Sequence, residues 1–308
     1  MSKYIPIVFG EPKSINSEII VKAWKKSGKL KTKIFVIGNY LIFKNQLKKY
    51  KIKIKLNKIN KFKDINNKKD SLNIIDIPNG NRFVLNCIDY AHKLSITNKI
   101  KGWINAPINK KIFKFKYLGL TEYLAFKNKL SNSEVMMIYN KNFAVVPITT
   151  HVSIKDVTKK INTKIIINKV LSLNKNYLKY FRRKPKIAIL GLNPHNSEGK
   201  KNSIENKIIK PAKEFLTKKK INITGPFPAD TVFINNKINY DVIIGMYHDQ
   251  VLAPFKAING FDAINITLGL KYIRISPDHG VGENIIGMNQ ANSSSLLLSI
   301  KYLNKLVK

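Results

Sequence analysis

The chain has 308 residues, 44% of them hydrophobic, which is enough for two α/β domains or one large unit with a buried core. Its longest apolar runs are shorter than the roughly 18 residues that a membrane helix needs, and its opening, MSKYIPIVFG, is too short an apolar stretch for a secretory signal. The single cysteine, Cys87, excludes a disulfide scaffold and a thiolate metal cluster. We therefore expect a cytoplasmic protein without membrane segments.

The net charge of +38 raises the possibility of nucleic-acid binding, because basic surfaces attract phosphate backbones. Only four of the 56 basic residues are arginines, however, and the lysines are scattered among many Ile and Asn residues, as A- and T-rich codons would produce. Nucleic-acid sites favour arginine and stacked aromatic side chains, and neither pattern is present. We expect no specific nucleic-acid binding, although a basic nucleic-acid-binding protein stays as an alternative.

In chain order, residues 4–10 (YIPIVFG) predict a strand that leads into a glycine turn. Residues 16–28 (NSEIIVKAWKKSG) predict a capped amphipathic helix closed by Gly28, and residues 33–38 (KIFVIG) predict the next strand. The Lys-rich stretch 44–69 is typical of solvated helix faces and loops. No G-x-G-x-x-G follows the first strand, so a nicotinamide cofactor would need a different binding loop.

Further strand candidates recur through the rest of the chain, mostly separated by Lys-rich helical stretches, with no internal repeat and no long linker. Such alternation predicts a doubly wound α/β architecture. The candidates are KGWINAPINK (101–110), SEVMMIYN (133–140), NFAVVPITT (142–150), KPKIAILGLNP (184–194), NITGPFPAD (222–230), DVIIGMYHDQ (241–250) and AINITLGL (263–270).

Four of the five histidines follow short apolar runs that predict buried strands: His151, His195, His248 and His279. Ligands bind in open α/β sheets where the carboxyl ends of the strands meet. Four histidines at strand ends therefore indicate a site, whereas His92 lies in a helix-like stretch.

Seven motifs, in order and covering almost the whole chain, are similar to those of the 4-hydroxythreonine-4-phosphate dehydrogenase family of the pyridoxal phosphate pathway. One such motif would be weak evidence, but seven in order are specific. They are INAPINK (104–110), GLTEYLA (119–125), TTHVSIKDV (149–157), GLNPHNSEG (191–199), GPFPADTVF (225–233), MYHDQVLAPFK (246–256) and NITLGLKYIRISPDHG (265–280).

The resemblance implies an isocitrate/isopropylmalate dehydrogenase-like α/β fold, with two α/β/α domains and a central cleft. Residues 1–116 and 253–308 would form the outer, cofactor-side domain, and residues 117–252 the middle domain with the interface of a homodimer. The implied reaction is NAD-dependent oxidation of 4-phosphohydroxy-L-threonine to 2-amino-3-oxo-4-phosphonooxybutyrate, which decarboxylates to 3-amino-2-oxopropyl phosphate. A paralogous metal-dependent dehydrogenase of another phosphorylated or carboxylated hydroxy acid is the nearer alternative.

The same resemblance assigns most site residues. It implies that His151, His195 and His248 bind one divalent metal, zinc with magnesium or cobalt as alternatives, in a site shared between two subunits. It places the substrate on four residues and the adenine end of NAD, or of NADP, on two more. The substrate residues are Thr121, Lys256, Asn265 and Arg274, and the cofactor residues are His279 and Gly280.

Each assignment has a structural alternative. Thr121 and Asp249 could instead cap helices, and Arg274 could form a structural ion pair. Asp249 is expected either to orient a ligating imidazole or to transfer protons. Lys110 is expected to transfer protons or orient substrate, with a surface lysine as its alternative.

Three departures count against an unmodified family site. Leu120 stands where the family motif has a substrate-contacting histidine. The loop GEPKSINSE (10–18) replaces a small, glycine-rich loop, and SEGKKNSIEN (197–206) lacks the second glycine and the paired acids that follow Gly199 in the family.

Overall fold

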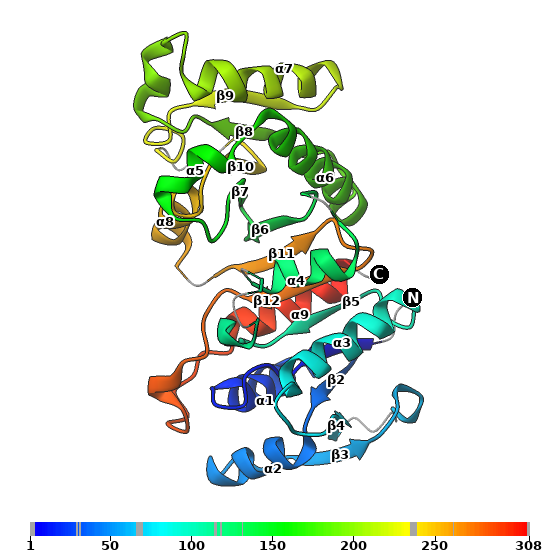
Figure 1. Ribbon diagram of the computed structural model, residues 1–308. Helices are drawn as coiled ribbons and strands as arrows, with labels where there is room; N and C mark the ends of the chain where they lie inside the picture. Colours follow the sequence, from blue (N-terminus) through cyan, green and yellow to red (C-terminus); the bar gives the residue numbers. More distant parts are fainter. Residues whose placement is uncertain are drawn as a thin grey trace. The chain divides into compact units, whose positions relative to one another are not determined.

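The computed structural model describes residues 4–28, 30, 32–65, 70–113, 116–117, 119–130, 132–234, 239–260 and 262–306. The chain divides into two compact units. The first contains Met1–Lys116 and Lys271–Lys308, and the second contains Tyr117–Leu270 (Figure 1).

The first unit is built on a parallel sheet whose strands are buried on both faces, except at the edge strand β3. Continuous runs of Val, Ile and Phe, as in KIFVIG, suit such strands because helices cover both sides of a parallel sheet. The strand order is β3 (Lys55–Ile59), β4 (Ser71–Asp76), β2 (Lys33–Gly38), β1 (Tyr4–Val8), β5 (Gly102–Asn105) and β12 (Ile273–Pro277).

Helices pack on this sheet in two groups. Helix α9 (Ser294–Leu306) packs on β12 and β5 and against α1 (Asn16–Lys26), and α3 (Phe83–Ile96) packs on β1, β2 and β5. Within α3, His92 is buried and its Nδ1 lies 2.8 Å from the Tyr272 hydroxyl, so this histidine is a satisfied core residue. The remaining elements are α2 (Tyr40–Lys49), η1 (Phe62–Asp64), η2 (Lys110–Phe113) and η5 (Glu283–Ile285).

The start of α1 differs from the expected side-chain cap. Its N-cap is Ile15, which provides no capping hydrogen bond, and its C-cap is Ser27, one residue before Gly28. The Asn16 amide instead donates to the carbonyls of Phe9 and Pro107, so it ties the loop after β1 to the segment after β5. A polar residue at a helix start thus serves the tertiary structure here.

The second unit has a mixed sheet. Strand β6 (Val135–Tyr139) is antiparallel to both of its neighbours, and the other pairs are parallel. The order is β11 (Ile264–Leu268), β6, β7 (Ala144–Pro147), β10 (Val242–Gly245), β8 (Ile187–Leu190) and β9 (Ile223–Phe227). Around it lie α4 (Leu120–Lys127), α5 (Ile154–Lys160), α6 (Thr163–Phe181), η3 (Pro194–Gly199), η4 (Glu205–Ile209), α7 (Lys210–Lys218) and α8 (His248–Asn259).

The core of the second unit lies where α8 packs against the parallel strands. Val251 and Phe255 of α8 join Val145, Leu190 and Ile243 of β7, β8 and β10, and all five are fully buried. This packing fixes α8, which begins with His248, at the carboxyl end of β10.

The division of the chain differs at one boundary from the sequence-based expectation. The expected border at residues 252/253 falls inside α8, whereas the second unit continues to Leu270. The physical reason is that α8 contacts β7 and β10, and β11 pairs with β6, so both elements are held by this unit.

Among the described residues, no helix combines the length and apolarity that a membrane crossing would require.

Candidate functional site

Three of the strand-end histidines follow three adjacent parallel strands. Strand β10 pairs with β7 on one side and with β8 on the other, and His248, His151 and His195 follow these strands respectively. Parallel strands end at the same edge of a sheet, so the segments that carry the three histidines leave the sheet at one edge. The segments that follow β7 and β10 are also connected, because the Thr149 hydroxyl donates a hydrogen bond to the Met246 carbonyl at 2.8 Å.

His151 and His248 lie beside each other, with ring centroids 5.6 Å apart. His248 is the first residue of α8, and its Nδ1 lies 2.6 Å from Asp249 Oδ1. Asp249 is therefore not the helix cap, a position that Tyr247 occupies. A carboxylate on Nδ1 fixes the tautomer and ring orientation and leaves Nε2 as the atom with a lone pair for a ligand.

His195 lies on a strained turn. It and the next three residues have φ values of 48, 54, 56 and 52°, all in the left-handed region. For residues other than glycine this conformation costs about 1–2 kcal/mol per residue. A run of four therefore persists only because neighbouring groups hold it.

Those neighbouring groups converge on Glu205, which sequence reasoning did not identify. Glu205 is 1% exposed, and its carboxylate accepts hydrogen bonds from the backbone N–H groups of Leu192 and Asn193, at 3.0 and 2.8 Å. The Asn193 amide and the Ser197 hydroxyl donate to it as well. Burial would raise the pKa of Glu205, but these hydrogen bonds outweigh burial and hold the pKa below its ordinary value.

Gln250 is a second residue that sequence reasoning missed. Its side-chain oxygen accepts from the Met246 N–H at 2.6 Å, and its amide donates to the Gly191 carbonyl at 2.7 Å. One side chain thus connects the residue after β10 with the residue after β8. In sequence, Gln250 has no local pattern that distinguishes it from other polar residues of a first helical turn.

Among the residues that the structure describes, no cluster of three or more His, Cys, Asp or Glu side chains has a geometry ready to hold a metal. The single chain brings His151 and His248 together, while His195 follows the neighbouring strand β8. The donor set consists of imidazoles, which are good ligands for zinc, cobalt and related ions.

The predicted substrate residues of the second unit lie around β11. Thr121, in the first turn of α4, is buried, and its hydroxyl lies 3.4 Å from that of Thr267; the N-cap of α4 is Gly119. Asn265 precedes Thr267 by two residues, so both side chains point to the same face of the strand. The Asn265 Oδ1 atom is buried without a hydrogen-bond partner. Lys256 is half-buried in α8, just over two turns after His248.

In the first unit, Arg274 is buried in β12 and its Nε donates to Asn105 Oδ1 at 2.5 Å. Asn105 ends β5, so the guanidinium is held at a strand end by a neutral amide in this contact. Lys110 begins η2, but its side chain lies outside the described part of the structure.

The predicted cofactor residues follow β12. The Nδ1 atom of His279 lies 3.0 Å from the Gly280 carbonyl, and its Nε2 is buried without a hydrogen-bond partner. A methyl group on Gly280 would meet no atom within 4 Å, so the packing of this chain does not itself require glycine there.

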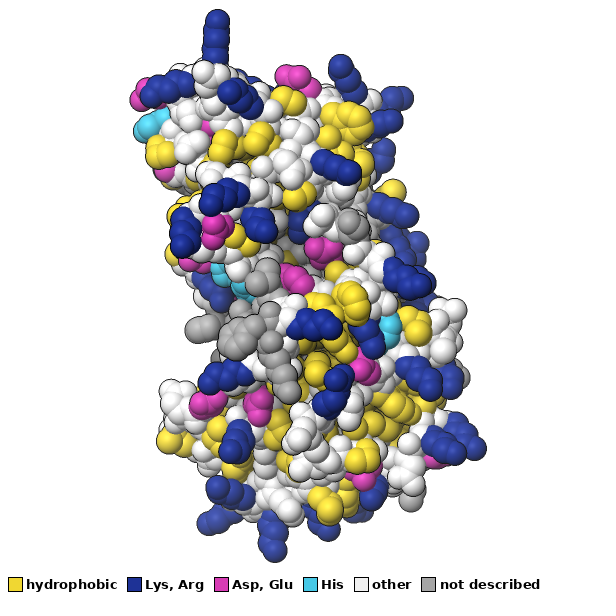
Figure 2. Space-filling model, in the orientation of Figure 1, with side chains coloured by type: hydrophobic (Ala, Val, Ile, Leu, Met, Phe, Trp, Pro, Cys, Tyr) yellow, Lys and Arg dark blue, Asp and Glu magenta, His cyan; other side chains and the backbone are white. Residues whose placement is uncertain are grey.

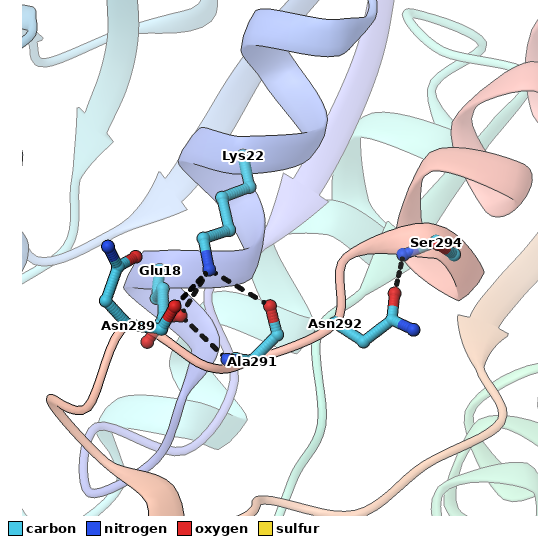
Figure 3. Close-up of polar contacts among 6 residues, drawn as sticks. All are labelled: Glu18, Lys22, Asn289, Ala291, Asn292 and Ser294. Carbon is cyan, nitrogen blue, oxygen red and sulfur yellow. Dashed lines mark hydrogen bonds and ion pairs between the residues drawn. The ribbon is translucent and has the colours of Figure 1, made fainter.

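The segment after this turn is tied to α1 (Figure 3). The Glu18 carboxylate, fully buried, accepts from the Ala291 N–H at 2.9 Å and from the Lys22 ammonium at 2.7 Å. The Lys22 ammonium also donates to the carbonyls of Asn289 and Ala291. A pocket of about 310 Å³ adjoins these contacts and is lined by Lys22, Lys25, Lys26, Ala291, Asn292 and Ser293.

On the face shown in Figure 2, the described Lys and Arg residues are spread over both units, with acidic groups and apolar side chains between them. This face therefore lacks the continuous basic groove that follows a nucleic-acid backbone.

The amino-acid sequence is similar to that of known proteins. Residues 30–303 match the family model described as "Pyridoxal phosphate biosynthetic protein PdxA". The chain is 34% identical to 4-hydroxythreonine-4-phosphate dehydrogenase of Aquifex aeolicus, over 100% of this chain and 99% of that protein. It is 30% identical to D-threonate 4-phosphate dehydrogenase of Salmonella typhimurium, over 97% of this chain and 98% of that protein.

The fold is also similar to that of solved structures. The crystal structure of 4-hydroxythreonine-4-phosphate dehydrogenase from Klebsiella pneumoniae matches with a TM-score of 0.87 and 28% identity, covering 100% of both chains. Isocitrate dehydrogenase from Methylococcus capsulatus matches with a TM-score of 0.52 and 11% identity, covering 97% of this chain and 84% of that one. The second likeness concerns the fold alone, which is the isocitrate dehydrogenase-like α/β fold expected from the sequence.

Proposed function

Because the chain belongs to the PdxA family of pyridoxal phosphate biosynthesis, we propose that it oxidises 4-phosphohydroxy-L-threonine with NAD. The product would be 2-amino-3-oxo-4-phosphonooxybutyrate, which loses carbon dioxide to give 3-amino-2-oxopropyl phosphate. The observation that carries the proposal is the arrangement of histidines after three adjacent parallel strands, with His151 beside His248 at 5.6 Å.

His151, His195 and His248 would hold one divalent metal ion, zinc or alternatively cobalt or magnesium. The donor chemistry fits, since three imidazoles leave coordination positions open for a substrate. Asp249, at 2.6 Å from His248 Nδ1, would keep the free lone pair on Nε2. When bound, the metal would act as a Lewis acid toward the substrate hydroxyl, and the dinucleotide would accept the hydride.

The substrate carries a phosphate, a carboxylate and an amine, and the described residues offer matching groups. The Asn265 Oδ1 atom lacks a partner in the chain, so it is suited to accept a hydrogen bond from the ammonium group. Lys256 and Arg274 would bind the anionic groups, and Thr121 would donate its hydroxyl. Arg274 is oriented by Asn105, whose side-chain oxygen accepts from Nε, and a planar guanidinium is suited to two-point recognition of an anionic group. Lys110 and Asp249 are the candidates for proton transfer.

His279 and Gly280 would bind the adenine end of NAD, with NADP as the alternative. Two observations fit this role: the His279 Nε2 atom is buried without a partner, and the space beside Gly280 is open. A purine ring offers both a flat face and hydrogen-bonding nitrogens to such a group.

The chain would act as a homodimer in which the second subunit contributes to each metal site. An incomplete set of ligands in one chain is compatible with such sharing. Among the described residues, seven of the ten exposed large hydrophobic side chains belong to the second unit, which supports an interface there. They are Phe126, Ile154, Leu171, Leu178, Phe215, Ile234 and Ile258.

A second candidate is oxidation of D-threonate 4-phosphate, the substrate named for relatives that are 30% identical to this chain. Leu120 is the residue that leaves this candidate open, because an apolar residue stands where the family motif has a substrate-contacting histidine. The two substrates differ at carbon 2, where one has an amine and the other a hydroxyl.

The discriminating experiment measures NADH formation by the purified protein with each of these two substrates, and with malate, isocitrate and 3-isopropylmalate. We expect the highest kcat/KM with 4-phosphohydroxy-L-threonine. Treatment with a chelator, or the substitution His151→Asn, should abolish turnover, while Lys155→Gln, an exposed change four residues from His151, should not. A higher kcat/KM for D-threonate 4-phosphate would replace the first proposal with the second, and full activity of metal-free protein would exclude the metal role.

A further inference from the structure

The turn that carries His195 needs an external support. Residues 195–198 are four consecutive non-glycine residues in the left-handed region, and each would be more stable elsewhere in conformational space. Without contacts from outside the turn, the backbone would leave this conformation, and the imidazole at its first position would lose its direction.

Glu205 supplies that support from the start of η4, a single π-helical turn that leads into α7. Its two carboxylate oxygens accept from four donors, all in the segment 192–197: two backbone N–H groups, the Asn193 amide and the Ser197 hydroxyl. These donors lie on both sides of His195 in sequence. The carboxylate therefore fixes the entry to the turn and its third residue at once.

The other side of the turn is fitted against the end of β8. The Asn196 amide donates to the Pro226 carbonyl at 2.9 Å. Its Oδ1 would lie 2.0 Å from a methyl group on Gly191, so the turn can approach only because that position is glycine. Gly191 is in turn bound by Gln250, the residue two positions after His248. Leu192, which donates to Glu205, is adjacent in the chain to Gly191, which accepts from Gln250, so two hydrogen bonds and one peptide link connect Glu205 to the segment that carries His248.

We propose that Glu205 is a positioning residue that presents His195 to the metal, and this inference rests on the proposed metal site. An ionised carboxylate is needed for a chemical reason: it only accepts hydrogen bonds, and every group directed at it is a donor. Glutamine at this position would direct its own N–H₂ group at one of those donors. The shape would be kept while the contact that holds the turn is lost.

The test compares full-length wild type with Glu205→Gln in two measurements on the metal-free protein. The first is amide hydrogen exchange of residues 192–198. The second is titration with Co²⁺, followed through its visible ligand-field bands, which respond to the number of bound imidazoles. We expect faster exchange in this segment and a roughly 10- to 100-fold weaker Co²⁺ affinity with an altered spectrum.

Three further variants separate positioning from general destabilisation. Glu198→Gln changes an exposed acid on the same turn and should alter neither measurement. Leu173→Ala makes a cavity in α6 and should lower stability while leaving the Co²⁺ spectrum unchanged. Ser197→Ala removes one of the four donors, so it should weaken Co²⁺ binding less than Glu205→Gln, and the double variant should bind no more weakly than Glu205→Gln alone.

The outcomes that overturn the inference are distinct from those that overturn the function. If wild type binds Co²⁺ and Glu205→Gln binds it within twofold and with the same spectrum, Glu205 does not position a ligand. If wild type binds no Co²⁺, the proposed metal site itself is wrong. If Leu173→Ala weakens Co²⁺ binding as much as Glu205→Gln does, with the same spectral change, Glu205 has only a general structural role.

Discussion

At the scale of single residues, the contacts of the ring nitrogens determine which histidines are candidate ligands. His92 is used by the core, because its Nδ1 contacts the Tyr272 hydroxyl and its ring packs edge-on against that tyrosine. His248 has one nitrogen engaged by Asp249 and the other directed elsewhere. His279 keeps a buried nitrogen without a partner. One residue type thus serves as core or candidate ligand according to its contacts.

Leu120 offers a test at this scale. It is 6% exposed, at the first position of α4 and next to Thr121. The substitution Leu120→His would restore a donor, and a hydrogen bond to a charged group contributes about 1.5–3 kcal/mol. We expect Leu120→His to lower the KM for 4-phosphohydroxy-L-threonine, with the metal requirement unchanged and some loss of thermal stability because a polar ring is buried.

Steady-state kinetics and thermal unfolding of the same preparation provide the measurement. Leu41→His, an exposed change in α2, controls for the introduction of an imidazole and should leave KM unchanged. A clearly raised KM for the phosphorylated threonine derivative would instead indicate a pocket shaped for a less polar substrate.

At the scale of elements, the pairing of β5 with β12 leaves no room for a side chain at Gly102. A Cβ at this position would lie 2.4 Å from both the carbonyl oxygen and a side-chain methyl group of Ile273, its partner in the parallel register. We expect Gly102→Ala to destabilise the protein by about 1–3 kcal/mol, as overpacking does.

Urea unfolding monitored by circular dichroism measures this cost. Gly80→Ala is the matched control, since a Cβ there meets nothing within 4 Å and the residue is exposed. Equal stability of the two variants would mean that the strands can separate at Gly102 without cost.

Most elements were predictable because their patterns are local. Strands with continuous apolar runs, such as KIFVIG and VIIG, form where expected. Two strands, β3 and β4, were not expected: KLNKI carries two lysines and an asparagine, and its pairing with β4 is a tertiary contact that no local pattern reveals. The boundary at residue 270 was missed for the same reason, because β11 is assigned by its pairing with β6.

The candidate site was likewise predictable only where its residues belong to local patterns. The histidines were identifiable because each follows a strand, and the family motifs carried the remaining assignments. Glu205 and Gln250 were not identifiable, because their significance lies in contacts alone. The partners of Glu205 are 8 to 13 residues away, and Gln250 donates to Gly191, 59 residues away. The expected side-chain cap of α1 is missing for a related reason, because the Asn16 amide donates to distant carbonyls and not to the helix that it begins.

At the scale of the whole molecule, association is the property to test. We expect sedimentation velocity at micromolar concentration to give a dimer, because the proposed metal site takes ligands from a second subunit and because seven of the ten exposed large hydrophobic side chains among the described residues belong to the second unit. Activity and dimer content should fall together on dilution. A fully active monomer would contradict both the interface and the shared site.

The position of β3 has a consequence for how the protein behaves at high concentration. As the last strand of the first unit's sheet, it presents an edge to which another chain's strand could add. Lys55 and Lys58 on this strand are exposed and paired with Asp70 and Asp76 at 3.2 and 3.0 Å. If the β3 strands of two molecules paired edge to edge, the lysines of one strand would be buried against those of the other. The lysine-rich composition therefore protects this edge against strand addition and aggregation.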